Sequence, residues 1–147
     1  MLFQMPFDFL PSPLDGLGTT NSYSYIDSQT NGVNIRTGDP LPITGLSKHN
    51  VNATVYWEKG PLGFRMAYNW RSKYLESIGP GGSGVFFDSI DNLSLSARLQ
   101  ITDQFSIDAQ ANNVLDSRIR KFGGVEDATL LYGLNGRTFS LGLRGKF

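Results

Sequence analysis

The chain has no cysteine among its 147 residues and only one histidine. The lack of thiols excludes a disulfide scaffold, a thiolate nucleophile and a cysteine-ligated zinc site. The sequence also lacks any run that approaches the roughly 18 apolar residues of a membrane-spanning helix. Few catalytic or metal-binding constellations can be built from what remains, so we expect no enzymatic activity, no cofactor and no bound metal.

Net charge is absent as well. Thirteen basic residues balance thirteen acidic residues, and the mean hydropathy is −0.21. Proteins that bind nucleic acid through bulk charge carry a basic surface, so we expect no nucleic-acid partner. The first seven residues, MLFQMPF, lack the basic start, apolar core and cleavage site of a secretory signal. We expect that an exported protein of this kind has a further segment upstream.

The chain is instead rich in two-residue alternation of apolar and polar side chains. Residues 138–147 place Phe139, Leu141, Leu143 and Phe147 on one face and small, polar or charged residues on the other. A period of two indicates a β-strand. Strands are likewise expected over residues 3–9, 23–25, 51–58, 62–71, 93–101 and 105–112. The sequence therefore predicts an all-β chain of about seven antiparallel strands and no helix of useful length.

The connections between the expected strands alternate in length. Short turns are expected near residues 11–16, 58–61 and 102–104, and long polar loops near residues 28–47, 76–90 and 116–135. Short turns at one end and long loops at the other are typical of an up-and-down transmembrane β-barrel of the bacterial outer membrane. Such a barrel closes with an even number of strands, at least about eight, so seven strands predict an incomplete barrel.

Six segments carry a likeness to a known family. They are residues 9–18 (FLPSPLDGLG), 41–50 (LPITGLSKHN), 55–60 (VYWEKG), 68–75 (YNWRSKYL), 112–116 (NNVLD) and 136–147 (GRTFSLGLRGKF). Together, and in this order, they resemble the carboxy-terminal third of a TonB-dependent outer-membrane receptor. The resemblance is closest to the subgroup common in Xanthomonas- and Caulobacter-like bacteria.

This resemblance implies active uptake of a scarce nutrient, such as a siderophore, cobalamin or a glycan, through a plugged barrel of about 22 strands. Residues 1–147 have room for neither the plug, the TonB box nor the earlier strands, so we expect one fragment of barrel wall with extracellular loops. Its location would be the outer membrane of a Gram-negative cell. Its partners would be outer-membrane lipid, the remaining barrel and plug, and the barrel-assembly machinery. The TonB complex would be reached only through the missing amino-terminal part.

Charged residues on the polar face of the expected strands are the first candidate site. They are Arg65, Arg71, Arg98, Asp108 and Arg144. In a barrel this face lines the lumen, where charges pair across strands, support the plug or contact solute. Structural pairing is the preferred interpretation of the five.

Two further sites are expected near the carboxy-terminus. Arg118, Arg120 and Lys121 fall in the last long loop, where they are candidates for contact with an arriving ligand. Phe147 ends an amphipathic strand on an aromatic residue. The resemblance implies that this residue is a barrel-assembly signal, and it also suits an anchor at the membrane interface.

Two other functions fit the same pattern. The chain could be a stand-alone small outer-membrane barrel with a structural or adhesive role. It could also be a soluble β-sandwich or lipocalin-like binding module whose apolar faces point inward. An intact upstream signal peptide with one more strand would support the small barrel. Ready solubility without detergent and a two-state unfolding transition would support the soluble module.

Overall fold

The protein is all-β in a computed structural model that describes residues 1–146. Every pairing between its strands is antiparallel. No helix in this range is long and apolar enough to span a bilayer. The elements are β1 (Leu2–Pro6), η1 (Leu14–Gly16), β2 (Leu17–Tyr25), β3 (His49–Lys59), β4 (Leu62–Arg71), β5 (Tyr74–Ile78), η2 (Pro80–Gly82), β6 (Gly84–Phe87), β7 (Ile90–Gln100), β8 (Phe105–Asn112), β9 (Arg118–Gly123), β10 (Thr129–Leu134) and β11 (Thr138–Gly145).

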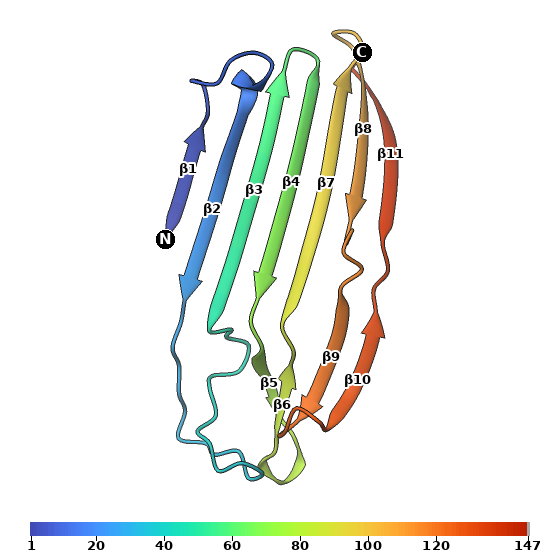
Figure 1. The fold of residues 1–147 in the computed structure, drawn as a ribbon. Helices are drawn as coiled ribbons and strands as arrows, with labels where there is room; N and C mark the ends of the chain where they lie inside the picture. Colours follow the sequence, from blue (N-terminus) through green and yellow to red (C-terminus); the bar gives the residue numbers. More distant parts are fainter. Residues whose placement is uncertain (147) are drawn as a thin grey trace.

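The main sheet has seven strands in the order β1-β2-β3-β4-β7-β8-β11. Each of the seven expected strands has a counterpart in this sheet, so the all-β, antiparallel prediction is confirmed. The second strand was expected over residues 23–25 but begins earlier, at Leu17. Figure 1 shows them side by side, with the short connections at one end of the sheet and the long ones at the other. The first strand was expected to reach Phe9 but ends at Pro6, on the edge strand. An edge position suits proline because proline has no N–H to donate to a further strand.

The prediction of long polar loops near residues 76–90 and 116–135 was wrong. These segments form a four-stranded sheet in the order β5-β6-β9-β10. This order matches that of β4, β7, β8 and β11 in the main sheet. Figure 1 shows the reason: each of these four strands is joined, across an irregular break, to one strand of the small sheet. The small strands are only four to six residues long, and two of their pairings carry register shifts. These shifts interrupt the two-residue period by which strands are recognised in sequence.

Few apolar side chains are buried within residues 1–146. They are Leu41, Leu75 and Phe122, and all three belong to the small sheet or to the segment of residues 26–48 that packs against it. Phe86 stacks on Phe122 with ring centroids 5.4 Å apart. The main sheet, in contrast, is a single layer with both faces accessible. Its stability within this range therefore depends on ladder hydrogen bonds and cross-strand side-chain pairs.

The register gives the main sheet one continuous apolar face. Val55 lies opposite Met66, Met66 opposite Leu95 and Leu95 opposite Ala111. Ala111 in turn lies opposite Phe139 on β11. Because side chains alternate between faces, the residues between these positions point to the opposite, polar face. We call the two surfaces the apolar face and the polar face.

A glycine makes room for an aromatic ring on the polar face. Gly18 on β2 lies opposite Tyr56 on β3. A Cβ added at Gly18 would lie 2.3 Å from the Tyr56 ring. The tyrosine therefore covers the backbone of β2, an arrangement that helps to maintain strand register where a glycine leaves no side chain to pack.

Candidate functional site

The polar face of the main sheet brings together the five charged residues predicted to share it. Arg65 and Arg71 lie on β4, Arg98 on β7, Asp108 on β8 and Arg144 on β11. Arg98 is directly opposite Asp108, and Ser106, two residues before Asp108, is opposite Arg144. That this face lines a transport lumen stays a prediction.

Three of these residues form a charge cluster. The Arg98 guanidinium donates to the Asp108 carboxylate with Nε 2.6 Å from Oδ1, and Arg144 Nε lies 4.0 Å from Oδ2 of the same carboxylate. The Asp108 side chain is 19% exposed and the two arginines more than half exposed. Exposed pairs of this kind contribute about 0–1 kcal/mol. Their contacts are those expected of pairing across neighbouring strands.

The other two arginines differ in their surroundings. Arg65 has no hydrogen-bond or ion-pair partner among residues 1–146, and it lines a hollow of about 520 Å³ with Glu58 and Arg98 near the short turns. Arg71 is held at the opposite end. It donates from Nε to Ser47 Oγ at 2.8 Å and lies 3.9 Å from the centroid of the Tyr74 ring. Arg71 thus ties residues 26–48 to the junction of β4 and β5.

A row of asparagines on the polar face was not predicted. Asn52 on β3 lies opposite Asn69 on β4, which lies opposite Asn92 on β7. Ser22 on β2 extends the row on one side, and Asn113 follows Asn92 on the other. The alternation places each asparagine on the polar face, but their alignment depends on strand register, which the sequence does not reveal.

The three candidate loop contacts lie on a strand, so their assignment to a loop was wrong. Arg118, Arg120 and Lys121 belong to β9 of the small sheet. Lys121 Nζ donates to Glu76 on β5 at 2.6 Å. Arg118 lies 6.0 Å from the centroid of the Tyr132 ring. At least Lys121 is therefore engaged within the protein, while contact of any of the three with a ligand stays a prediction.

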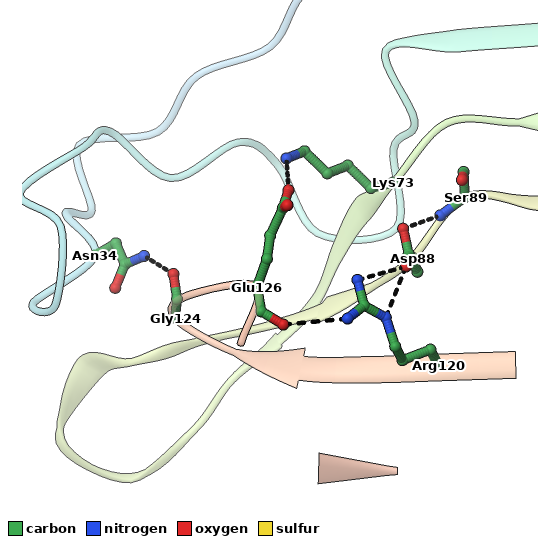
Figure 2. Close-up of polar contacts among 7 residues, drawn as sticks. All are labelled: Asn34, Lys73, Asp88, Ser89, Arg120, Gly124 and Glu126. Atoms are coloured by element: carbon green, nitrogen blue, oxygen red, sulfur yellow. Dashed lines mark hydrogen bonds and ion pairs between the residues drawn. The ribbon is translucent and has the colours of Figure 1, made fainter. Parts of the chain in front are cut away.

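Arg120 belongs to a network that links the three long connections (Figure 2). Its Nε donates to Asp88 Oδ2 at 2.8 Å, and its Nη1 donates to the backbone oxygen of Glu126 at 3.2 Å. The buried amide of Asn34 donates to the backbone oxygen of Gly124 at 3.0 Å. Lys73 Nζ lies 2.6 Å from Glu126 Oε1. The long connections therefore form one interlinked unit at this end of the sheet.

Comparisons with known proteins do not identify the chain. It matches no protein-family model, no curated protein and no solved structure. The resemblance to TonB-dependent receptors therefore rests on the sequence segments alone. The proposed barrel-assembly residue, Phe147, lies outside the residues that the structure describes. Within residues 1–146, no group of three or more histidine, aspartate and glutamate side chains is arranged to hold a metal ion.

The Lys73–Glu126 pair predicts a pH dependence of the linked connections. The hydrogen bond from the Lys73 ammonium, with its charge, lowers the pKa of Glu126 from its usual value. A lowered pKa means that the folded state binds this proton less readily than an open state does. The stabilisation is therefore present above the ordinary carboxyl pKa and is lost as the pH falls from about 5 to about 3.

This dependence is measurable by NMR. We expect the Glu126 carboxyl resonance to titrate at lower pH than an unperturbed glutamate, with backbone shifts of Gly124 following it. In Lys73→Met the titration should return to the ordinary range, whereas Lys146→Met, remote in sequence and structure, should leave it unchanged. A normal Glu126 titration in the unaltered chain would contradict the pairing.

Proposed function

We propose that this chain is a segment of outer-membrane barrel wall from a nutrient-uptake receptor of the TonB-dependent kind, without enzymatic activity. Its apolar face would contact lipid, its polar face would line the lumen, and its long connections would form the extracellular rim. The observation that carries the proposal is the continuous apolar face with aromatic side chains at both ends. The sequence segments that resemble this family support it independently.

The two tryptophans of the chain mark the ends of the apolar face. Trp57 on β3 lies opposite Phe64, near the short turns, and Trp70 lies near the long connections. Trp70 is six residues beyond Phe64 on the same strand, which corresponds to about 20 Å along a strand. The lipid-facing band of an outer-membrane barrel is about 25 Å tall and is flanked by aromatic girdles. The spacing of the tryptophans suits such a band.

The exposure of the apolar face also favours a lipid partner. On β11, Phe139, Leu141 and Leu143 are each more than 70% exposed. Soluble proteins rarely leave a broad, contiguous apolar surface in water. The four-stranded sheet extends the main sheet beyond its end and does not cover this face (Figure 1). A soluble β-sandwich would need a second layer that residues 1–146 do not supply.

Depth-dependent fluorescence quenching tests the proposal. The chain is refolded into phosphatidylcholine vesicles that carry bromine either near the headgroup or near the chain end, using Trp57→Phe and Trp70→Phe to leave one tryptophan at a time. We expect both tryptophans to be quenched more by the shallow bromine than by the deep one. As a positive control for depth, Leu95→Trp in a chain without the other tryptophans should show the reverse order.

Several results would count against a barrel wall. The soluble module would be favoured if bromine quenched neither Trp57, nor Trp70, nor the tryptophan introduced by Leu95→Trp. A chain that is monomeric and fully soluble without detergent would favour it as well. Insertion accompanied by assembly of identical chains into a closed ring would favour a stand-alone barrel. In that case the edge strand β1 of one chain would pair with the edge strand β11 of the next chain.

A further inference from the structure

Two asparagine–glycine pairs occur in the chain, Asn31–Gly32 and Asn135–Gly136, and no other asparagine is followed by glycine. This pair of residues rearranges readily without an enzyme, because glycine has no side chain to hinder the approach of its backbone nitrogen to the asparagine amide. The rearrangement needs an accessible side chain and a backbone that is free to turn. The fold decides which of the two pairs meets these requirements.

The Asn135–Gly136 pair lies in the irregular break between β10 and β11 (Figure 1). Neither residue belongs to a strand ladder, and Asn135 is exposed. Within residues 1–146, the Asn135 amide makes no hydrogen bond and the Gly136 N–H donates none. Gly136 has a positive φ of 70°, and a Cβ added there would meet no atom within 4 Å. The Gly136 nitrogen and the Asn135 amide carbon are therefore free to approach one another.

The Asn31–Gly32 pair, in contrast, is held in place. The Gly32 N–H donates to Thr30 Oγ1 at 3.2 Å, and the Gly32 carbonyl accepts from the Leu41 N–H at 2.8 Å. The Thr30 N–H and the Thr30 hydroxyl both donate to the Leu41 carbonyl, at 2.8 and 2.9 Å. Leu41 is itself buried. Attack by the Gly32 nitrogen would require these contacts to open first.

We propose that Asn135 is a site of spontaneous deamidation through a cyclic imide. The Gly136 backbone nitrogen forms a bond to Cγ of Asn135, and the side-chain amide nitrogen leaves as ammonia with the proton of the attacking N–H. The product is a five-membered imide ring. Water then adds to one of the two imide carbonyl carbons and breaks the bond from that carbon to nitrogen. The reaction needs only water, so the inference does not depend on the barrel-wall proposal.

The carbon that water attacks decides what residue 135 becomes. Opening at Cγ restores the normal backbone and leaves aspartate. Opening at the backbone carbonyl carbon leaves isoaspartate, in which the chain runs through Cγ and is longer by one carbon. Both products carry a carboxylate in place of the neutral amide, in the hollow of about 300 Å³ that Asn135 lines together with Arg71 and Asp91. The modification therefore changes the charge of this hollow and, in isoaspartate, the length of the backbone.

The longer backbone should break a link between two neighbouring breaks in the strands. Asn113, between β8 and β9, donates from Nδ2 to the Gly136 carbonyl at 2.7 Å, and its Oδ1 accepts from the Ser117 N–H at 2.9 Å. Asn113 has a positive φ of 54°, a conformation that few residues other than glycine adopt. An extra carbon before Gly136 displaces the carbonyl to which Asn113 donates. Isoaspartate should therefore loosen this junction, whereas aspartate should leave it intact.

Peptide mapping by mass spectrometry tests the inference on the full 147-residue chain, refolded in detergent micelles and stored at neutral and at alkaline pH. Trypsin releases residues 122–137, in which Asn135 is the only asparagine, and residues 1–36, which contain Asn31. The deamidated peptides are heavier than the parent, and isoaspartate elutes apart from aspartate. We expect Asn135 to convert about threefold to tenfold faster than Asn31, the factor for one hydrogen bond that must open first.

Two variants and one solvent condition separate the effect of the fold from that of the local sequence. Asn135→Gln should yield no product over the same period, because its longer side chain would have to close a less favourable six-membered ring. Thr30→Val removes the hydroxyl that holds the Gly32 N–H and should speed the conversion of Asn31 alone. In concentrated urea the rates at Asn31 and Asn135 should converge, because glycine follows both.

Amide hydrogen exchange measures the effect on the junction. The Ser117 amide, which donates to Asn113 Oδ1, should exchange faster in the isoaspartate fraction of the stored chain than in the fresh chain. Asn135→Asp is the matched control, because it carries the same charge on a normal backbone and should keep the exchange rate of the fresh chain. Unchanged exchange in the isoaspartate fraction would overturn the predicted loosening.

Other results would overturn the deamidation itself. They are equal rates at the two pairs in the folded chain, faster conversion of Asn31, and a rate that does not rise with pH, since the attacking nitrogen must lose its proton. Aspartate as the sole product would also overturn it, because direct hydrolysis of the amide yields no isoaspartate. Tryptophan quenching in vesicles is independent of these results, so their failure leaves the barrel-wall proposal standing.

Discussion

Replacing Leu95 with arginine should destabilise the lipid-inserted chain by about 2–4 kcal/mol, the usual cost of a charge on the lipid face near the bilayer midplane. Leu95 lies in the middle of β7, between Met66 and Ala111 on the apolar face. An arginine there would have to reach around the sheet or draw water into the hydrocarbon. The expected result is a lower midpoint of urea unfolding in vesicles, followed by tryptophan fluorescence.

The adjacent residue provides the matched control. Ser94 precedes Leu95 on β7 and lies opposite Ala67 on the polar face, away from the other arginines of that surface. Ser94→Arg adds the same side chain on the same strand but should cost much less, because its guanidinium remains in water. Similar costs for the two variants would contradict the assignment of the apolar face to lipid.

Replacing Leu75 with alanine should unfold the small sheet while leaving the main sheet intact. Leu75 is fully buried, and it lies opposite Phe86, which stacks on buried Phe122. Removal of a buried leucine side chain costs about 2–5 kcal/mol. A small sheet with so few buried apolar residues has little stability to spare, so we expect this loss to exceed what holds β5, β6 and β9 together.

Amide hydrogen exchange measures this local effect. In Leu75→Ala, amides of β6 and β9 should lose protection by a factor of about 30 or more, whereas those of β3 and β4 should keep theirs. Leu143→Ala serves as the control, because Leu143 is 71% exposed and its truncation leaves no cavity. Uniform loss of protection across both sheets would show that they unfold as one cooperative unit.

The positions of the long strands follow from local pattern, and this explains which predictions held. The runs around Val55, Met66, Leu95 and Ala109 alternate without interruption, so each strand and its two faces are readable from the residues alone. Gly60, at a positive φ of 54°, marks the tight turn between β3 and β4. The same alternation placed Arg65, Arg71, Arg98, Asp108 and Arg144 together on one face, as the register confirms.

The small sheet escaped prediction because its cues are not local. β6 has four residues, and its partners β5 and β9 lie before and well after it in the chain. The interlinked unit of the long connections depends on distant contacts such as that of Asn34 with Gly124, two residues that are 90 positions apart in the chain. The placement of Arg118, Arg120 and Lys121 in a loop failed for this reason.

The sequence by itself determined the all-β class, the presence of seven strands, the short turns between them and the two faces, because alternation and turn chemistry act between near neighbours. The tertiary structure alone decided the register between the strands and the pairing of the small sheet. It thereby decided the alignment of Asn52, Asn69 and Asn92, the Arg98–Asp108 pair and the interlinked unit of the long connections. The physical reason is that each of these features depends on hydrogen-bonded pairing between segments distant in the chain, and a one-residue shift in that pairing would reverse every face.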